Sequence, residues 1–334
     1  MRFAICSEIE VTRPNVLVLA SEVLFQHFFT ERSLRKLEEV SSWSRSALRE
    51  DSPELRSEIA NADVLMTTWH SPFLTADMLG EERRVKLIAH CGGEVKSRVA
   101  EEIFEFVTIT NAADPMARGV AEMALALALT LVRRIPDYAR EMREGVVRTN
   151  AEVSEGETFF GRRVGIVGFG RIGRAFARLL PPFGVDVLVS DPYAPEHSIE
   201  LDELVASCSV VVICAALTPE TRGMFDKRRL SLLMDGAFLI NVARGGLIEM
   251  DALLDELRRG RITVALDVTD PLEPLPVEHE LRRLPNAILT PHIAAGGIEM
   301  RREIGAIAVE EVVRFAKGEP PLNRVTSDML ATMT

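Results

Sequence analysis

The sequence predicts an α/β protein with two Rossmann-like or flavodoxin-like domains, each built on a parallel sheet, around a central cleft. Short apolar runs alternate with segments of helical period along almost the whole chain. This alternation is typical of parallel sheets, because crossover helices bury both faces of each strand. A length of 334 residues is enough for two hydrophobic cores.

The N-terminal part of the chain is expected to form the first sheet. A helix is predicted over residues 14–29, because Pro14 suits a first helical turn, and a second over residues 52–61. The short apolar runs that predict strands in this part are residues 2–6, 64–67, 87–90 and 107–110.

A long helix rich in alanine and leucine is predicted over residues 115–143. Pro136 is expected to kink or split it, since proline cannot donate a helical hydrogen bond. The most apolar part, residues 120–132, contains Glu122 and is too short to span a bilayer, so no membrane partner is expected. The polar stretch over residues 144–161 is expected to be a loop.

The alternation resumes in the C-terminal half, which is expected to form the second sheet. A final helix is predicted over residues 297–317 and ends before Gly318, a residue type favoured just after a helix. The other helices of this half are predicted at residues 171–180, 227–234 and 251–259. Its strands are predicted at residues 164–167, 185–190, 210–213, 237–241, 263–267 and 287–290.

Three glycines with the spacing G-x-G-x-x-G follow the first of these strands, at Gly168, Gly170 and Gly173. Gly168 permits a tight turn, Gly170 lets a pyrophosphate approach the backbone, and Gly173 lets the next helix pack close to the strand. The N-terminus of that helix offers N–H groups and the positive end of its dipole to phosphates. The motif predicts dinucleotide binding, and the alternative is a glycine turn in an unrelated α/β protein.

The acidic residue Asp191 ends the next strand, 18 residues after Gly173. An acid at this distance hydrogen-bonds the adenosine ribose hydroxyls and would repel a 2′-phosphate. The residues directly after it, 192–194, contain no arginine to attract such a phosphate. We therefore expect NAD rather than NADP as the cofactor.

Composition and charge exclude several classes of protein. The formal net charge of −11 argues against a nucleic acid or an anionic membrane as partner. The N-terminus shows no cleavable apolar segment, so a cytoplasmic location is expected. The cysteines have no C-x-x-C spacing and no nearby histidine cluster, so neither a disulfide framework nor a metal site is expected; they are Cys6, Cys91, Cys208 and Cys214.

Three segments that follow predicted strands carry polar groups: residues 241–246, 267–274 and 290–294. Ligands of open α/β sheets bind outside the carboxyl ends of the strands, so these segments are expected to lie at one edge with the glycine loop. The motifs GIVGFGRIG, LTPETRG, INVARGGLIE, ALDV with a Glu-Pro pair, and LTPHIA occur in this order. In these motifs the chain closely resembles the D-isomer-specific 2-hydroxyacid dehydrogenases, over essentially its whole length.

The resemblance implies a division into two domains. Residues 1–114 and 297–334 would form the substrate (catalytic) domain, and residues 115–296 the NAD-binding Rossmann domain. It also implies a homodimer. Because the chain would cross twice between the domains, a hinge that closes over the ligand is expected.

The resemblance also implies three catalytic residues whose types suit the chemistry. Arg244 would hold the substrate carboxylate and polarise its carbonyl, because a guanidinium offers a planar, bidentate fork. His292 would act as the acid and base, and Glu273 would orient it. The family usually places this glutamate one residue earlier, so Asp270 remains a competing partner for His292.

Further contacts are carried over by the same resemblance. The backbone N–H groups of Gly92 and Gly93 would contact the substrate together with Arg244 and His292, although a plain tight turn is the alternative. Trp69 and His70 end a predicted strand and either line this pocket or belong to the core and rim. The expected cofactor-binding residues are Gly168, Gly170, Arg171, Ile172, Gly173, Asp191, Thr218, Ala243, Asp267 and His292.

The implied function is NAD-dependent hydride transfer between a small 2-oxo acid and a D-2-hydroxy acid. The sequence leaves the acid and the physiological direction open. One alternative is an NAD(H)-sensing binding protein of the corepressor type on the same fold. Another is a phosphite or formate dehydrogenase, of which the pairing of His292 with Glu273 argues against the formate type.

Overall fold

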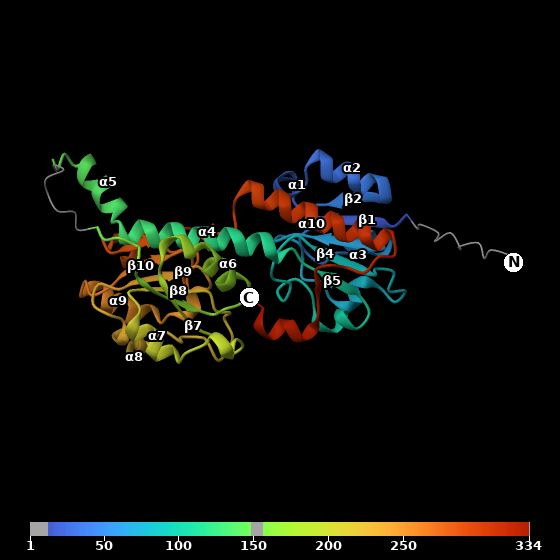
Figure 1. Cartoon of the computed structure of the whole chain (residues 1–334). Helices are drawn as coiled ribbons and strands as arrows, with labels where there is room; N and C mark the ends of the chain where they lie inside the picture. The colour runs from blue at the N-terminus through green and yellow to red at the C-terminus, as the bar shows by residue number, and fades with distance from the viewer. Residues whose placement is uncertain (1–12, 148–155, 334) are drawn as a thin grey trace. The chain divides into compact units, whose positions relative to one another are not determined.

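The computed structural model describes residues 13–147 and 156–333, which form two compact units (Figure 1). Unit 1 contains the described residues up to Met116 together with Ile298–Met333. Unit 2 contains the described residues of the segment Ala117–Gly297. Both units are α/β structures with a largely parallel sheet, so the predicted fold class is confirmed for each of them.

The sheet of unit 1 has the strand order β12-β5-β4-β3-β1-β2. All neighbours pair in parallel except β12, which runs antiparallel to β5. The order places β1 between β2 and β3, so the direction of strand progression reverses there. The strands are β1 (Asn15–Leu19), β2 (Ser42–Ser46), β3 (Val64–Thr67), β4 (Leu87–His90), β5 (Thr108–Thr110) and β12 (Arg324–Val325).

The helices of unit 1 begin at the capping residues that the sequence offers. Ser21, Thr30 and Ser52 each accept a hydrogen bond from a backbone N–H of the first turn. The last α-helix of the chain packs on the first two helices and on β4, and these elements enclose a core that contains the fully buried Phe28. These helices are α1 (Glu22–Phe28), α2 (Glu31–Val40), α3 (Pro53–Ala60) and α10 (Ile298–Ala316).

Two expectations for this unit need correction, and a third lies outside the described residues. The helix predicted over residues 14–29 is wrong, because residues 15–19 form the buried strand β1 and only residues 22–28 are helical. The run Val-Leu-Val-Leu suits a strand covered on both faces, and Pro14 stands before it. The edge strand β2 was not predicted. The strand expected over residues 2–6 lies outside the described residues.

The sheet of unit 2 has the order β11-β10-β9-β8-β6-β7, and every neighbouring pair is parallel. Its progression reverses between β6 and β8, which makes the carboxyl end of β6 the switch point of the sheet. The strands are β6 (Arg163–Val167), β7 (Asp186–Ser190), β8 (Val210–Ile213), β9 (Phe238–Asn241), β10 (Thr263–Leu266) and β11 (Ala287–Leu289).

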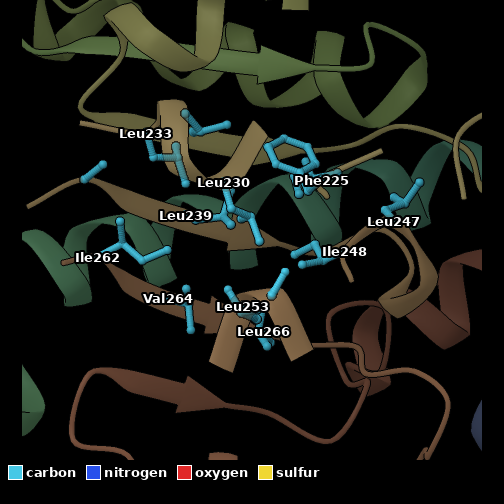
Figure 2. Packing of buried hydrophobic residues seen from close by; sticks show 14 of the residues in the cluster. Phe225, Leu230, Leu233, Leu239, Leu247, Ile248, Leu253, Ile262, Val264 and Leu266 are labelled. Atoms are coloured by element: carbon cyan, nitrogen blue, oxygen red, sulfur yellow. The ribbon is translucent and has the colours of Figure 1, made fainter. Parts of the chain in front are cut away.

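Helices cover both faces of this sheet and bury its apolar side chains. Figure 2 shows one of the two cores, in which Leu230 and Leu253 from the helices pack with Leu239 and Leu266 from the strands. The helices are α6 (Arg171–Leu179), α7 (Leu201–Ser207), α8 (Lys227–Leu232) and α9 (Met250–Arg258). Because the core is closely packed, the positions at which the loops leave the strands are well defined.

The long helix predicted over residues 115–143 is present as two helices, α4 (Ala113–Val132) and α5 (Ile135–Arg143). They are separated at Arg134, whose φ of +52° is left-handed, and Pro136 lies in the first turn of the second helix. Contrary to expectation, α4 is long and apolar enough to cross a membrane by length and composition alone. Half of its apolar window is buried, and Ala121, Ala124 and Ala128 belong to the second core of unit 2.

Candidate active site

The glycine loop connects β6 to α6 at the switch point of unit 2. Gly168 has a φ of +91°, and a Cβ atom there would lie 2.6 Å from the Cα of Ala215. A Cβ on Gly173 would run into the carbonyl oxygen of Gly168. Both positions therefore need glycine, one for the turn and one for the close packing of helix and strand.

The middle glycine faces the other way. A Cβ atom on Gly170 would meet no atom within 4 Å, and Gly170 is the N-cap of α6. The backbone of the helix N-terminus thus borders open space, with Arg171 exposed and Ile172 half-buried beside it. This cradle fits the pyrophosphate of a dinucleotide, which binds to helix N–H groups.

The carboxylate of Asp191 is joined to this loop by hydrogen bonds. Its Oδ2 accepts from the N–H of Phe169 at 2.5 Å, and its Oδ1 accepts from the N–H of Tyr193 at 2.8 Å. Asp191 therefore lies directly beside the glycine loop, as the ribose-binding prediction requires. That role remains a prediction.

The structure brings His292 and Glu273 together. The Nδ1 of His292 lies 3.0 Å from Oε1 of Glu273, and the two side chains are 46% and 39% exposed. The competing residue Asp270 lies instead 3.5 Å from the guanidinium of Arg222. The geometry thus pairs His292 with Glu273 and gives Asp270 a different partner, a choice that the sequence left open.

The backbone at His292 is held in the left-handed region, with a φ of +53°. This conformation is uncommon for a residue other than glycine and persists where neighbouring bonds fix it. The buried residue Asp267 supplies those bonds. Its carbonyl accepts from the N–H of His292 at 2.8 Å, and its carboxylate accepts from the N–H groups of Ile293 and Ala294 at 3.0 and 2.9 Å.

Asp267 was expected to contact the cofactor. Its carboxylate instead accepts hydrogen bonds from the loop that carries His292, including one from the Thr290 hydroxyl. We describe it as a positioning residue for that loop. Sequence reasoning missed this role, because a strand-end aspartate carries no sign of which loop it will bind.

The loop that carries Arg244 is ordered by Asn241, which is fully buried. The Asn241 side-chain amide donates to the carbonyl of Arg244 at 2.9 Å, and its oxygen accepts from the N–H of Ala243 at 3.0 Å. A Cβ atom on Gly245 would collide with the backbone of Thr269. The absence of a side chain at Gly245 therefore lets the loop of Arg244 pack directly against the loop that leads to Glu273.

Two other predicted cofactor contacts lie at the same carboxyl edge. The carbonyl of Ala243 accepts from Nη1 of Arg244 at 2.8 Å. The N–H of Thr218 donates to the hydroxyl of Thr221 at 2.8 Å, which forms a turn after β8. Their contact with a cofactor stays a prediction.

In unit 1 the predicted substrate glycines follow β4. The N–H of Gly92 donates to the carbonyl of His90 at 2.9 Å, so a bound carboxylate would compete with that bond. The carbonyl of Gly93 accepts from the amide of Asn111 at 2.6 Å, which holds the turn. A Cβ on Gly92 would collide with His90 and Trp69, so the turn needs glycine for close packing in any case.

The ring of His90 is buried and hydrogen-bonded. Its Nδ1 lies 2.9 Å from the hydroxyl of Thr67. Burial, with a smaller effect of Arg98, lowers the pKa of His90 to about 3. His90 is therefore neutral near pH 7 and belongs to the buried interior of unit 1. Burial also raises the pKa of Cys208 to about 11 and of Cys214 to about 12, so both are protonated thiols at neutral pH.

No group of three or more His, Cys, Asp or Glu side chains suited to a metal ion occurs within residues 13–147 and 156–333. The carboxyl edge of unit 2 carries an imidazole–carboxylate pair, a guanidinium and a glycine loop that fits a dinucleotide.

Comparison with known proteins agrees with this geometry. Residues 125–294 match the family model described as D-isomer specific 2-hydroxyacid dehydrogenase, NAD binding domain. The glyoxylate reductase of Thermococcus onnurineus is 32% identical over 320 residues, which cover 90% of this chain and 93% of that protein. The crystal structure of the TT0316 protein from Thermus thermophilus has 31% identity and a TM-score of 0.76, and the match covers 93% of this chain and all of that one.

A longer relative matches as well. The D-3-phosphoglycerate dehydrogenase of Methanocaldococcus jannaschii is 30% identical over 277 residues, which cover 80% of this chain. The chain spans only about half, 52%, of that protein's length. From the family model and these relatives, the chain belongs to the D-isomer specific 2-hydroxyacid dehydrogenases, a family of NAD-dependent oxidoreductases, and residues 125–294 are its NAD-binding domain.

Proposed function

We propose that this chain catalyses NAD-dependent interconversion of a small 2-oxo acid and a D-2-hydroxy acid. The observation that carries the proposal is the 3.0 Å pair of His292 and Glu273, located in the unit that also holds the glycine loop. An imidazole oriented by a carboxylate is the usual equipment for moving a proton to and from a reacting oxygen.

The bound nicotinamide supplies or accepts the hydride. In the reducing direction, the proton that the carbonyl oxygen needs comes from Nε2 of His292, while Glu273 holds Nδ1. In the oxidising direction, Nε2 takes the hydroxyl proton back. Glu273 fixes the orientation of the ring through the contact at Nδ1, which leaves Nε2 free to face the reacting oxygen.

Arg244 is proposed to hold the substrate carboxylate and the 2-oxo oxygen with its guanidinium fork. The buried side chain of Asn241 holds the backbone of this loop through two hydrogen bonds. The N–H groups at Gly92 and Gly93 are proposed as further donors to the carboxylate, at the cost of the Gly92 bond to His90.

The cofactor preference is proposed to be NAD over NADP. Asp191 lies against the glycine loop, where it would accept hydrogen bonds from the ribose hydroxyls and repel a 2′-phosphate. The homodimer and the cytoplasmic location also remain predictions, and the molecular mass of the protein in solution tests the first.

The test is a spectrophotometric panel that follows NADH absorbance with glyoxylate, hydroxypyruvate, pyruvate and 3-phosphohydroxypyruvate. We expect turnover with at least one of these acids and weaker turnover with NADPH. If NADH binds but no acid is reduced, the NAD(H)-sensing alternative replaces the enzymatic one. Oxidation of phosphite with NAD, measured in the same assay, would select that other alternative.

A further inference from the structure

The turn that carries Gly92 and Gly93 follows β4, and it is held by the segment that follows β5, the neighbouring parallel strand of unit 1 (Figure 1). The N–H of Ala112 donates to the carbonyl of Gly92 at 2.8 Å. The side-chain amide of Asn111 donates to the carbonyl of Gly93 at 2.6 Å. Both carbonyl groups therefore point toward the segment after β5, and we call residues 92–94 the unit 1 turn.

Two N–H groups of the unit 1 turn point the other way. In a trans peptide the carbonyl and the N–H of the next residue point in opposite directions, and both peptides of this turn are trans. The N–H groups of Gly93 and Glu94 therefore point away from the segment after β5. In the described part of the chain neither of them donates a hydrogen bond, whereas the N–H of Gly92 is bonded to the carbonyl of His90. Successive unpaired N–H groups form a concavity suited to the oxygens of an anion.

The direction of the second N–H group depends on a side chain. The carbonyl of Gly92 is held by backbone, but the carbonyl of Gly93 is held by the amide of Asn111, which is only 5% exposed. Glycine has little preference for one backbone conformation, so the peptide after Gly93 would rotate if it lost this partner. Asn111 therefore fixes the direction in which the Glu94 N–H points.

A second set of hydrogen bonds holds the backbone of Asn111. Its N–H donates to the carbonyl of Asn323 at 3.1 Å, directly beside the pairing of β12 with β5. Asn323 is held in turn by Glu311 of α10. The Oε1 atom of Glu311 accepts from the N–H of Asn323 at 2.9 Å and from its side-chain amide at 2.7 Å. The N–H of Leu322 donates to both oxygens of the same carboxylate at 3.2 Å.

The carboxylate of Glu311 is buried without a basic partner. The residue is 2% exposed, and it forms no ion pair within residues 13–147 and 156–333. A buried carboxylate is costly unless donors satisfy it, and removing one member of such a set leaves the others unpaired. The donors here belong to the segment before β12, so the bonds of Glu311 hold the segment that supports Asn111.

We propose that Asn111 is a positioning residue for the substrate carboxylate, because its side-chain amide aims the N–H groups of Gly93 and Glu94. Glu311 supports it through Asn323. The inference rests on the proposed function, in which this turn receives the carboxylate of the 2-oxo acid. The proton donor, the guanidinium fork and the cofactor cradle all belong to unit 2. Loss of the support should therefore weaken the binding of the acid and spare the chemical step, which raises KM and leaves kcat unchanged.

Asn111→Leu tests the amide, because leucine has nearly the same shape but no donor. With the best 2-oxo acid and saturating NADH, we expect KM for the acid to rise by about tenfold or more and kcat to change by less than about threefold. The Kd of NADH should stay unchanged. The matched control is Asn61→Leu, which changes an exposed asparagine of the same unit whose amide donates to the carbonyl of Ser57 at 2.9 Å. It should leave both KM and kcat unchanged.

A pair of substitutions at Glu311 keeps the test decisive if Asn111→Leu does not fold. Glu311→Gln keeps an oxygen that can accept both bonds from Asn323, whereas Glu311→Met removes it. KM should stay within about threefold of wild type in Glu311→Gln and rise by about fivefold or more in Glu311→Met. The control Glu310→Met changes the adjacent residue, which pairs with Lys36, and should leave KM unchanged. Equal KM values in Glu311→Gln and Glu311→Met, or an unchanged KM in Asn111→Leu, would overturn the inference while leaving the proposed reaction intact.

Binding of oxamate separates the two proposals if no acid is reduced. Oxamate has the carboxylate and the shape of a small 2-oxo acid, but an amide replaces its reducible ketone. Calorimetric titration of oxamate into the chain with bound NADH should give a Kd about tenfold weaker in Asn111→Leu and unchanged in Asn61→Leu. That result without turnover of any acid would keep the positioning role and reject the reaction. The same Kd in wild type and Asn111→Leu, or no binding of oxamate to the wild-type chain, would reject the positioning role.

Discussion

Nδ1 of His292 lies 3.0 Å from Oε1 of Glu273, although Asp270 stands three residues nearer to the preceding strand. Asp270 is turned toward Arg222 at 3.5 Å. The loop after β10 thus carries two carboxylates with two different partners. These contacts identify Glu273, rather than Asp270, as the carboxylate that orients the His292 ring.

The first prediction separates the two carboxylates. Glu273→Gln keeps the size of the side chain but removes the charged acceptor that orients the His292 ring. We expect kcat to fall by at least about tenfold, measured by NADH oxidation with the best 2-oxo acid. Asp270→Asn is the matched control and should change kcat by less than about threefold, since exposed ion pairs such as Asp270–Arg222 contribute little. A larger loss in Asp270→Asn would assign the role to Asp270.

The second prediction concerns the guanidinium fork of Arg244. Lysine retains the charge in Arg244→Lys but cannot form two parallel hydrogen bonds. We expect kcat/KM to fall by about tenfold or more, because charged hydrogen bonds are among the strongest that side chains form. The control is Arg283→Lys, which changes an exposed arginine of the same unit and should leave kcat/KM unchanged. Normal kinetics in Arg244→Lys would refute the clamp.

The third prediction concerns cofactor choice. Asp191→Asn keeps an oxygen for the Phe169 N–H but removes the charge that would repel a 2′-phosphate. The ratio of kcat/KM for NADH to that for NADPH should therefore fall by about tenfold. The control is Asp186→Asn, at the exposed start of β7, the strand that ends directly before Asp191, and it should leave the ratio unchanged. A constant ratio in Asp191→Asn would mean that this carboxylate does not face the ribose.

The fourth prediction follows from the buried ring of His90. Its folded pKa of about 3 lies below the usual value near 6.5, so below pH 6.5 the unfolded chain binds a proton that the folded chain does not. The contribution of His90 to the free energy of unfolding is thus complete above pH 6.5 and is lost as the pH falls toward 3.

Urea unfolding between pH 6.5 and 4 measures this effect. Removing the ring in His90→Gln should reduce the slope of the unfolding free energy against pH by up to about 1.4 kcal/mol per pH unit, the value for one proton. Identical slopes in His90→Gln and wild type would show that the folded protein takes up the proton too.

Much of the fold could be predicted because buried parallel strands are continuous apolar runs. The strands at residues 64–67, 87–90 and 210–213 have the predicted bounds. The edge strand β2, Ser-Trp-Ser-Arg-Ser, is polar and largely exposed, so no hydrophobic pattern marks it. Residues 14–29 contain an apolar run long enough for either a strand or a helix. Residues 15–19 form a strand because they are buried within the sheet of unit 1, which the sequence pattern alone does not reveal.

The candidate site was harder to predict where loops meet. The types and order of Arg244, Glu273 and His292 are visible in the sequence, but the pairing of Glu273 rather than Asp270 depends on how one loop turns. The role of Asp267 depends on a loop 23 to 27 residues away.

The most direct test of the central claim is the turnover of His292→Asn with a saturating 2-oxo acid and NADH. We predict a decrease in kcat of about 10²–10⁴-fold with NADH binding retained, because asparagine cannot donate the proton that the alkoxide needs. The control His279→Asn replaces a histidine whose Nδ1 accepts from the N–H of Leu281, and it should leave kcat unchanged. Wild-type turnover in His292→Asn would contradict the account.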